Sequence, residues 1–145
     1  MATIREMRGT DLEVVAELCK ELGYPVPPEE LKMRFALLSA SKVHALFVAE
    51  SPQKEIIGWA QVASSLALTA QIRCEIIGIV VTQTERRKGV GRKLVAHCEA
   101  WGKERNLGHI RVRSQALRES AHEFYNGLGY ELKKIQNVFV KRLEN

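Results

Sequence analysis

The sequence contains little cysteine, and the cysteines it has form no recognisable pattern. Its three cysteines, Cys19, Cys74 and Cys98, are an odd number without metal-ligand spacing, and each falls within an expected helix or strand. Reduced and packed thiols are therefore expected, which indicates a cytoplasmic protein. The histidines at positions 44, 97 and 109 show no ligand spacing with an acid or a cysteine, so no metal site is expected.

The chain also lacks long apolar runs, repeats, low-complexity tracts and linkers. Its strongest apolar run, Ile76 to Val81, has the length of a strand and not of a membrane span. The N-terminal residues lack the basic-then-apolar pattern of a signal peptide. A chain of 145 residues, 46% hydrophobic and 27% charged, is typical of a globular protein, so a single domain over residues 1–145 is expected.

The positive charge is concentrated in one short segment. The formal net charge is +5, and five basic residues lie between positions 86 and 93: Arg86, Arg87, Lys88, Arg92 and Lys93. So tight a cluster favours a small polyanionic ligand, because a nucleic-acid surface spreads its positive charge along a face. Neither nucleic acid nor a membrane is expected as a partner.

Apolar periodicity and turn signals predict an α/β protein with a mixed, mostly antiparallel central sheet flanked by helices. The segment 64–70 is ambiguous. Thr10 and Ser120 are expected to N-cap helices, each with a glutamate three residues on. The run from Ile76 is apolar on both faces, which predicts a central strand buried on both sides. Strands are expected at residues 3–7, 44–50, 56–63, 72–81, 109–114, 130–135 and 138–141, and helices at 11–22, 29–40, 90–105 and 120–127.

Between the strand at 72–81 and the next helix lies the stretch Arg86-Arg87-Lys88-Gly89-Val90-Gly91. Glycines let the backbone approach a ligand closely, and the free N–H groups of a first helical turn favour a phosphate. A Walker P-loop needs four residues between its glycines and a Gly-Lys-Ser/Thr ending, which this stretch lacks. A Rossmann turn needs a third glycine where Leu94 stands.

Arg86, Gly89 and Gly91 do match the Arg/Gln-x-x-Gly-x-Gly/Ala motif of the GNAT acyl-CoA-dependent N-acetyltransferases. The stretch Ala121 to Tyr130 is similar to the family's Ala-x-x-x-Tyr-x-x-x-Gly-Phe/Tyr segment. Together the two motifs cover residues 72–135 in the expected order. The resemblance implies the acyl-CoA N-acyltransferase fold and acetyl-CoA as the co-substrate.

The resemblance also implies which residues hold the cofactor. Backbone groups of the strand end would pair with the pantetheine arm, and the amides of the turn would hold the diphosphate. Many family members carry an asparagine for pantetheine where this chain has Arg118, which instead is expected to contact CoA phosphate, an acidic substrate group or a helix glutamate. The expected cofactor residues are Ile79, Val80, Val81, Arg86, Arg87, Lys88, Gly89, Val90, Gly91, Arg92 and Arg118.

Two residues are expected to be catalytic. Glu75 stands six residues before Val81, the spacing of the catalytic glutamate in the histone-acetylating branch of the family, and would take the proton of the attacking amine directly or through water. The alternative is a structural glutamate paired with Arg73 or Arg111. Tyr125 matches the family tyrosine that protonates the departing thiolate, and its alternative is a core aromatic residue.

The resemblance therefore predicts acetyl transfer to a primary amine of a small molecule, by direct attack in a ternary complex. A bulge at Ile79 is expected to polarise the thioester carbonyl through a backbone N–H. A protein N-terminus or lysine as acceptor, and a CoA-binding sensor without catalysis, remain alternatives. A homodimer is also possible, since family members often dimerise.

Overall fold

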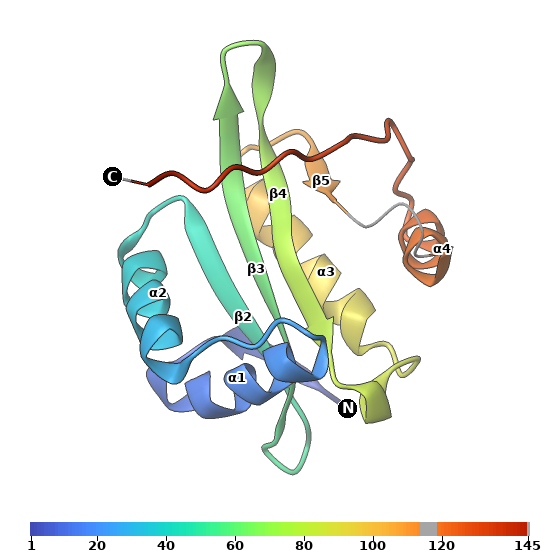
Figure 1. Cartoon of the computed structure of the whole chain (residues 1–145). Helices are drawn as coiled ribbons and strands as arrows, with labels where there is room; N and C mark the ends of the chain where they lie inside the picture. Colours follow the sequence, from blue (N-terminus) through green and yellow to red (C-terminus); the bar gives the residue numbers. More distant parts are fainter. Residues whose placement is uncertain (114–118, 145) are drawn as a thin grey trace. The chain divides into compact units, whose positions relative to one another are not determined.

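A computed structural model describes residues 1–113 and 119–144 of the chain. These residues belong to two units, Met1–Arg113 and Ser114–Asn145, which are described separately. The first unit contains the sheet and three of the α-helices (Figure 1).

The sheet has five strands in the order β1-β2-β3-β4-β5. Neighbours from β1 to β4 are antiparallel, and β4 pairs with β5 in parallel. This arrangement confirms the predicted mixed, mostly antiparallel sheet flanked by helices. The strands are β1 (Thr3–Glu6), β2 (His44–Glu50), β3 (Ile56–Ala67), β4 (Ala70–Val81) and β5 (Ile110–Val112).

Helices cover both faces of this sheet. On one face, Gly58 of β3 lies so close to α3 (Val90–Glu104) that an added Cβ would stand 3.3 Å from Leu94 Cδ1. On the other face the next residue, Trp59, packs against the buried cluster of α1 (Leu12–Glu21), which includes Val15. The helix α2 (Pro28–Ala40) follows α1 and contains no buried residue.

The apolar stripe predicted along the helix after Gly89 is confirmed. Its members occupy the sheet-facing side of α3 because helical spacing places them on one face. All five are buried: Val90, Leu94, Val95, Cys98 and Trp101.

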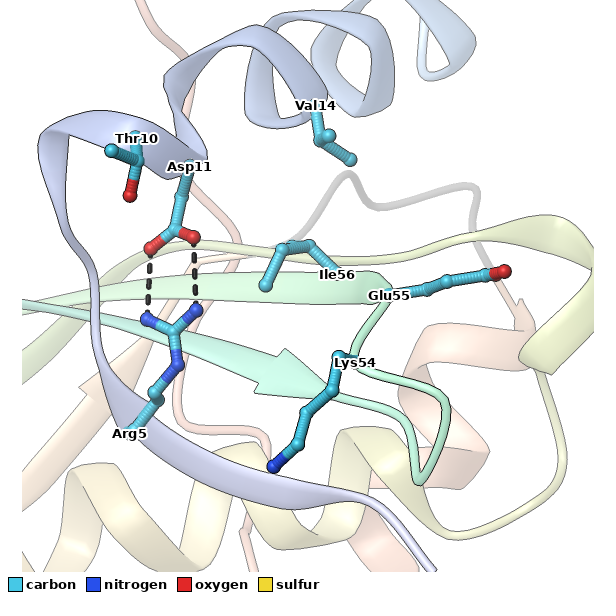
Figure 2. Close-up of a pocket in the computed structure, with 7 residues that line it drawn as sticks. All are labelled: Arg5, Thr10, Asp11, Val14, Lys54, Glu55 and Ile56. Atoms are coloured by element: carbon cyan, nitrogen blue, oxygen red, sulfur yellow. Dashed lines mark hydrogen bonds and ion pairs between the residues drawn. The ribbon is translucent and has the colours of Figure 1, made fainter.

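The prediction that Thr10 caps α1 is wrong. The short 3-10 helix η1 (Gly9–Asp11) precedes α1, and Asp11 occupies the N-cap position. The Asp11 carboxylate accepts hydrogen bonds from both terminal nitrogens of Arg5, each at 2.9 Å (Figure 2). It also accepts one from the backbone N–H of Arg8 at 2.7 Å. Arg5 also reaches Glu50 at 3.2 Å, so one partly buried ionic cluster connects β1, β2 and the start of α1.

The strand β4 differs from its prediction in two ways. The ambiguous segment 64–70 forms the end of β3, a turn and the start of β4. Burial on both faces from Ile76 onward is wrong, because Ile77 is 49% exposed. Gln61 pairs with Gly78 while Val62 pairs with Ile76, so Ile77 is the extra residue of a β-bulge and leaves the regular alternation.

The second unit contains the helix α4 (Glu119–Gly127), which is followed by Gly129 at φ +90°. Ser120 lies inside α4, so its predicted N-cap position is wrong. The two strands predicted at 130–135 and 138–141 are also wrong, because residues 130–144 form neither helix nor strand. Val138, Phe139 and Val140 are 83% to 91% exposed, so the segment lacks the buried face that would stabilise a hairpin.

Candidate active site

The parallel pairing of β5 with β4 covers only part of β4. Residues Cys74 to Ile76 pair with Ile110 to Val112, and in the described chain no strand pairs with β4 beyond Ile76 on this side. The backbone groups of β4 from Ile77 to Val81 therefore form an open edge, to which an extended amide-containing ligand can add by main-chain hydrogen bonds.

The three expected residues of the strand end lie on this open stretch. Val80 is buried, while Ile79 and Val81 are partly exposed. The carbonyl oxygen of Val81 accepts a hydrogen bond from Arg86 Nε at 3.2 Å, so the motif arginine braces the end of the strand. The bulge lies at Ile77, so its predicted position at Ile79 is wrong.

The turn between β4 and α3 ends in an open helix N-terminus. Arg87 and Gly89 both adopt left-handed backbone conformations, with φ of +66° and +84°. Gly89 is the N-cap of α3 and has no side chain with which to cap it, and the first helical bond runs from Lys93 N to Gly89 O. The amides of Val90, Gly91 and Arg92 therefore lack intrahelical acceptors and are available to an anion.

The basic side chains at this turn differ in whether they already have a partner. Lys88 pairs with Glu85 at 3.0 Å, and Lys93 donates to the Ala2 carbonyl at 2.8 Å. Arg87 and Arg92 are exposed, and neither makes an ion pair with another described residue. Their guanidinium groups can meet the charge of a phosphate at the helix start.

Glu75 lies opposite Arg111 across the β4–β5 pair. Its neighbours Cys74 and Ile76 are buried, and Cys74 lies against Gly102 of α3, so the Glu75 side chain is on the other face of the sheet. Arg111 Nε donates to Glu75 Oε1 at 2.9 Å, and Arg111 Nη2 donates to the same oxygen. Arg111 is thus the partner that the structural interpretation of Glu75 anticipated.

This ion pair does not by itself prevent Glu75 from acting as a proton acceptor. Within the described residues both hydrogen bonds end on Oε1, which leaves Oε2 for another donor. The side chains of Glu75 and Arg111 keep 16% and 25% of their surface exposed, so the pair is accessible from solvent.

Tyr125 belongs to the second unit, on α4. Its ring lies 5.0 Å from the ring of Phe124 and 5.6 Å from that of Tyr130, measured between centroids. The Tyr125 carbonyl accepts from the amides of Leu128 and Tyr130, each at 3.0 Å, which closes the end of α4. These contacts fix the tyrosine within its own unit. Arg118 lies outside the described residues.

The cysteines are unsuited to act as nucleophiles. Burial raises the pKa of the Cys74 thiol to about 11 and that of Cys98 to about 12. Burial also raises the pKa of the Cys19 thiol. Protonated, buried thiols do not attack a thioester, so the geometry favours transfer without a cysteine intermediate.

A pocket at the start of α1 shares no lining residue with this candidate site. It is lined by seven residues, none of which is expected to bind the cofactor: Arg5, Thr10, Asp11, Val14, Lys54, Glu55 and Ile56 (Figure 2). In the described part of the chain no group of three acidic, histidine or cysteine side chains is arranged to hold a metal ion. No helix there combines the length and apolarity needed to cross a bilayer.

Comparison with known proteins identifies the family. The sequence profile of the Acetyltransferase (GNAT) family matches residues 12–130, so the chain belongs to this family. None of the curated proteins compared with the chain matches it.

Similar solved structures cover nearly the whole chain. A protein described as a transcriptional regulator from Bacillus halodurans C-125 is 28% identical, with a TM-score of 0.82, over 96% of this chain and 100% of that one. The aminoglycoside acetyltransferase AAC(6')-Iy, solved with a CoA-containing bisubstrate analog, is 21% identical with a TM-score of 0.86, over 99% of both chains. AAC(6')-Ih from Acinetobacter baumannii is 17% identical with a TM-score of 0.84, over 99% of this chain and 100% of that one. The last two similarities, at 21% and 17% identity, show only that the fold is shared.

Sequence reasoning missed two residues that the structure connects to this region, Glu21 and Thr82. The Thr82 hydroxyl lies 3.0 Å from Glu21 Oε2, and the two residues are 61 positions apart. No motif or periodicity relates residues at such a separation, so only the fold reveals the contact.

Proposed function

We propose that this protein is an N-acetyltransferase that moves the acetyl group of acetyl-CoA to a primary amine of a small molecule. The observation that carries the proposal is the open edge of β4, which is followed after residues 82–89 by an uncapped, basic helix start. Pantetheine carries amides that suit a strand edge, and its diphosphate suits the helix N-terminus. Family membership and the CoA complexes of structures with this fold support the same ligand.

The proposed reaction is a direct attack within a ternary complex. The nitrogen of the neutral amine bonds to the thioester carbonyl carbon, the carbon–sulfur bond breaks, and CoA leaves as its thiolate. Glu75 takes the amine proton, directly or through water, and Tyr125 returns a proton to the thiolate. The buried, protonated cysteines support the absence of an acetyl-enzyme intermediate.

Arg87 and Arg92 are assigned to the phosphate groups of the cofactor, together with the amides of residues 87–92. Ile79, Val80 and Val81 provide the strand end along which pantetheine extends. Arg118 is assigned to a CoA phosphate or to an acidic group of the acceptor. A small molecule is the preferred acceptor class, and aminoglycosides are one candidate group because proteins of this fold are named for acting on them.

A second candidate function, a CoA-binding module without catalysis, is supported by two observations. Glu75 is engaged by Arg111, and a 28% identical protein is described as a transcriptional regulator. Calorimetric titration with acetyl-CoA and a turnover assay on the same preparation separate the two functions. Binding without any turnover over a broad amine panel would favour the module.

The decisive experiment is a CoA-release screen. The full chain is incubated with acetyl-CoA and with amino acids, polyamines, aminoglycosides or short peptides, and the free thiol is measured. Release that depends on one amine class, with a matching mass increase of 42 Da on that amine (roughly the mass of a transferred acetyl group less a proton), supports the proposal. Acetylation restricted to the peptides would replace the small-molecule acceptor with a protein one.

A further inference from the structure

The exposed carboxylate of Glu21, the last residue of α1, is bound to the segment that follows β4. The backbone N–H of Gln83 donates to Glu21 Oε1 at 2.7 Å. The Thr82 hydroxyl lies 3.0 Å from Oε2 and 3.3 Å from Oε1 of the same carboxylate. One side chain thus fixes two consecutive residues of a distant segment.

These bonds supply a cap that the segment does not make for itself. The 3-10 helix η2 (Gln83–Glu85) has Thr82 at its N-cap position, but Thr82 makes no side-chain cap bond. The hydroxyl donates to Glu21 instead. Glu21 also accepts the N–H of Gln83, the first residue of η2, whose amide has no acceptor within the helix. The hydrogen bonds from Gln83 and Thr82 lower the pKa of Glu21, so the carboxylate is ionised at neutral pH.

The capped segment leads directly into the phosphate-binding turn. From η2 the chain passes through the left-handed residues Arg87 and Gly89 into α3. Its other side-chain contacts are local, from Arg86 to Val81 and from Lys88 to Glu85. Among the described residues, Glu21 is the side chain by which another element holds residues 83–89.

We propose that Glu21 is a positioning residue for acetyl-CoA. Its carboxylate holds the segment between β4 and α3 in the conformation in which the amides of residues 87–92 converge on the diphosphate. Glu21 acts through the backbone and does not touch the cofactor. This inference rests on the proposed function for the identity of the ligand.

Electrostatic repulsion alone and a positioning role predict opposite changes in CoA affinity when Glu21 is removed. A negative charge near an anion site repels the anion, so its removal should strengthen binding if Glu21 had no structural role. A positioning role predicts weaker binding, because the free segment must be ordered when the cofactor binds. The sign of the change in affinity therefore separates the two explanations.

The test is a calorimetric titration of the full chain with CoA. For Glu21→Ala the Kd is expected to rise about three- to tenfold, the effect of one charge-assisted hydrogen bond moderated by its exposure. Glu17→Ala is the matched control, because Glu17 is an exposed acid one turn earlier on α1. Its Kd is expected to equal that of the wild type or to fall slightly.

Thr82 provides a second, independent variant. Thr82→Val removes the hydroxyl and is expected to weaken CoA binding, whereas Thr82→Ser retains it and restores binding. Glu21→Ala and Thr82→Val are expected to be less than additive in combination, because each removes part of one network. In turnover assays the loss is expected in the KM for acetyl-CoA rather than in kcat, and amide exchange at Gln83 is expected to accelerate in Glu21→Ala.

Two results would overturn the inference, and they are distinguishable. If wild-type protein binds CoA and Glu21→Ala binds it equally well or more tightly, the positioning role is wrong while the proposed function stands. If wild-type protein does not bind CoA at all, both the positioning role and the proposed function are wrong.

Discussion

Arg111 and Glu75 face each other across the short parallel pair β4–β5, and both of their hydrogen bonds end on one carboxylate oxygen. Beyond Ile76, no strand of the described chain pairs with β4 on the side of β5. The ion pair therefore lies one residue before the last pair between β4 and β5, Ile76 and Val112. The candidate proton acceptor lies at the beginning of the open edge to which the cofactor is assigned.

Glu75→Gln is expected to lower kcat about 100-fold, the usual contribution of a general base. Glutamine has nearly the same shape and can still accept from Arg111, but it cannot take a proton. The measurement is CoA release with the best amine of the screen. Glu13→Gln, which changes an exposed acid in the first turn of α1, is the control. Wild-type turnover in Glu75→Gln would show that this carboxylate is structural.

Tyr125→Phe is expected to lower kcat about 10- to 100-fold while the KM for acetyl-CoA changes little. Phenylalanine preserves the ring contacts with Phe124 and Tyr130 and removes only the hydroxyl. Steady-state kinetics with acetyl-CoA and the amine separates the two parameters. Tyr24→Phe, which removes an exposed hydroxyl from the first unit, is the control. An unchanged kcat would assign Tyr125 to the packing of its own unit.

The double variant Arg87→Gln/Arg92→Gln is expected to raise the Kd for CoA about 10-fold at low salt, and less at high salt. Both guanidinium groups are exposed at the start of α3 and make no ion pair with another described residue. Lys32→Gln, a change of an exposed cation on α2, should leave the Kd unaltered. Equal affinity of the double variant and wild type at every salt concentration would contradict the phosphate assignment.

Gly58→Ala is expected to destabilise the fold by about 1–3 kcal/mol, a typical cost of overpacking. The added Cβ would stand 2.8 Å from the Val80 carbonyl oxygen and 3.3 Å from Leu94 Cδ1. Denaturant unfolding measures the change. Gly9→Ala provides the comparison, since nothing lies within 4 Å of its added Cβ. If the two variants unfolded at the same denaturant concentration, the close approach of β3, β4 and α3 would be wrong.

Acid is expected to destabilise the protein through Asp11. Hydrogen bonds from Arg5 lower the pKa of Asp11 below its usual value of 3.8. A carboxyl whose folded pKa is depressed stabilises the fold above its unfolded pKa, and that contribution disappears as the pH falls through the folded pKa. Asp11→Asn is expected to lose about 1–3 kcal/mol at pH 7 and to flatten the pH dependence below pH 4. Chemical unfolding at a series of pH values tests this. If the free energy of unfolding fell equally with acid in wild type and in Asp11→Asn, groups other than Asp11 would cause the acid sensitivity.

Local patterns in the sequence predicted the elements whose residues bury a regular face. The stripe Val90, Leu94, Val95, Cys98 and Trp101 determined the sheet-facing side of α3, because helical periodicity alone brings these positions together. The glycine motif at 86–91 likewise located the helix start and its uncapped amides. Both signals are local, so no knowledge of the fold was needed.

The predictions that were wrong depended on distant partners. The bulge at Ile77 arises from the register between β3 and β4, which no local pattern specifies. The predicted closing hairpin has apolar residues, but they are exposed in the structure, so no buried face stabilises strands in residues 130–144. The N-cap position of α1 falls on Asp11 and not on Thr10, and the Asp11 carboxylate pairs with Arg5, which lies in strand β1 of the sheet and not in α1.

The sequence by itself determined the family and the class of fold, because these follow from motifs and periodicity within single segments. Tertiary structure alone decided which side chains meet across segments. It joined Glu75 to Arg111 and Glu21 to Thr82, contacts that span 36 and 61 residues. Such pairs form only after the strands and helices have packed, so their chemistry is a property of the fold.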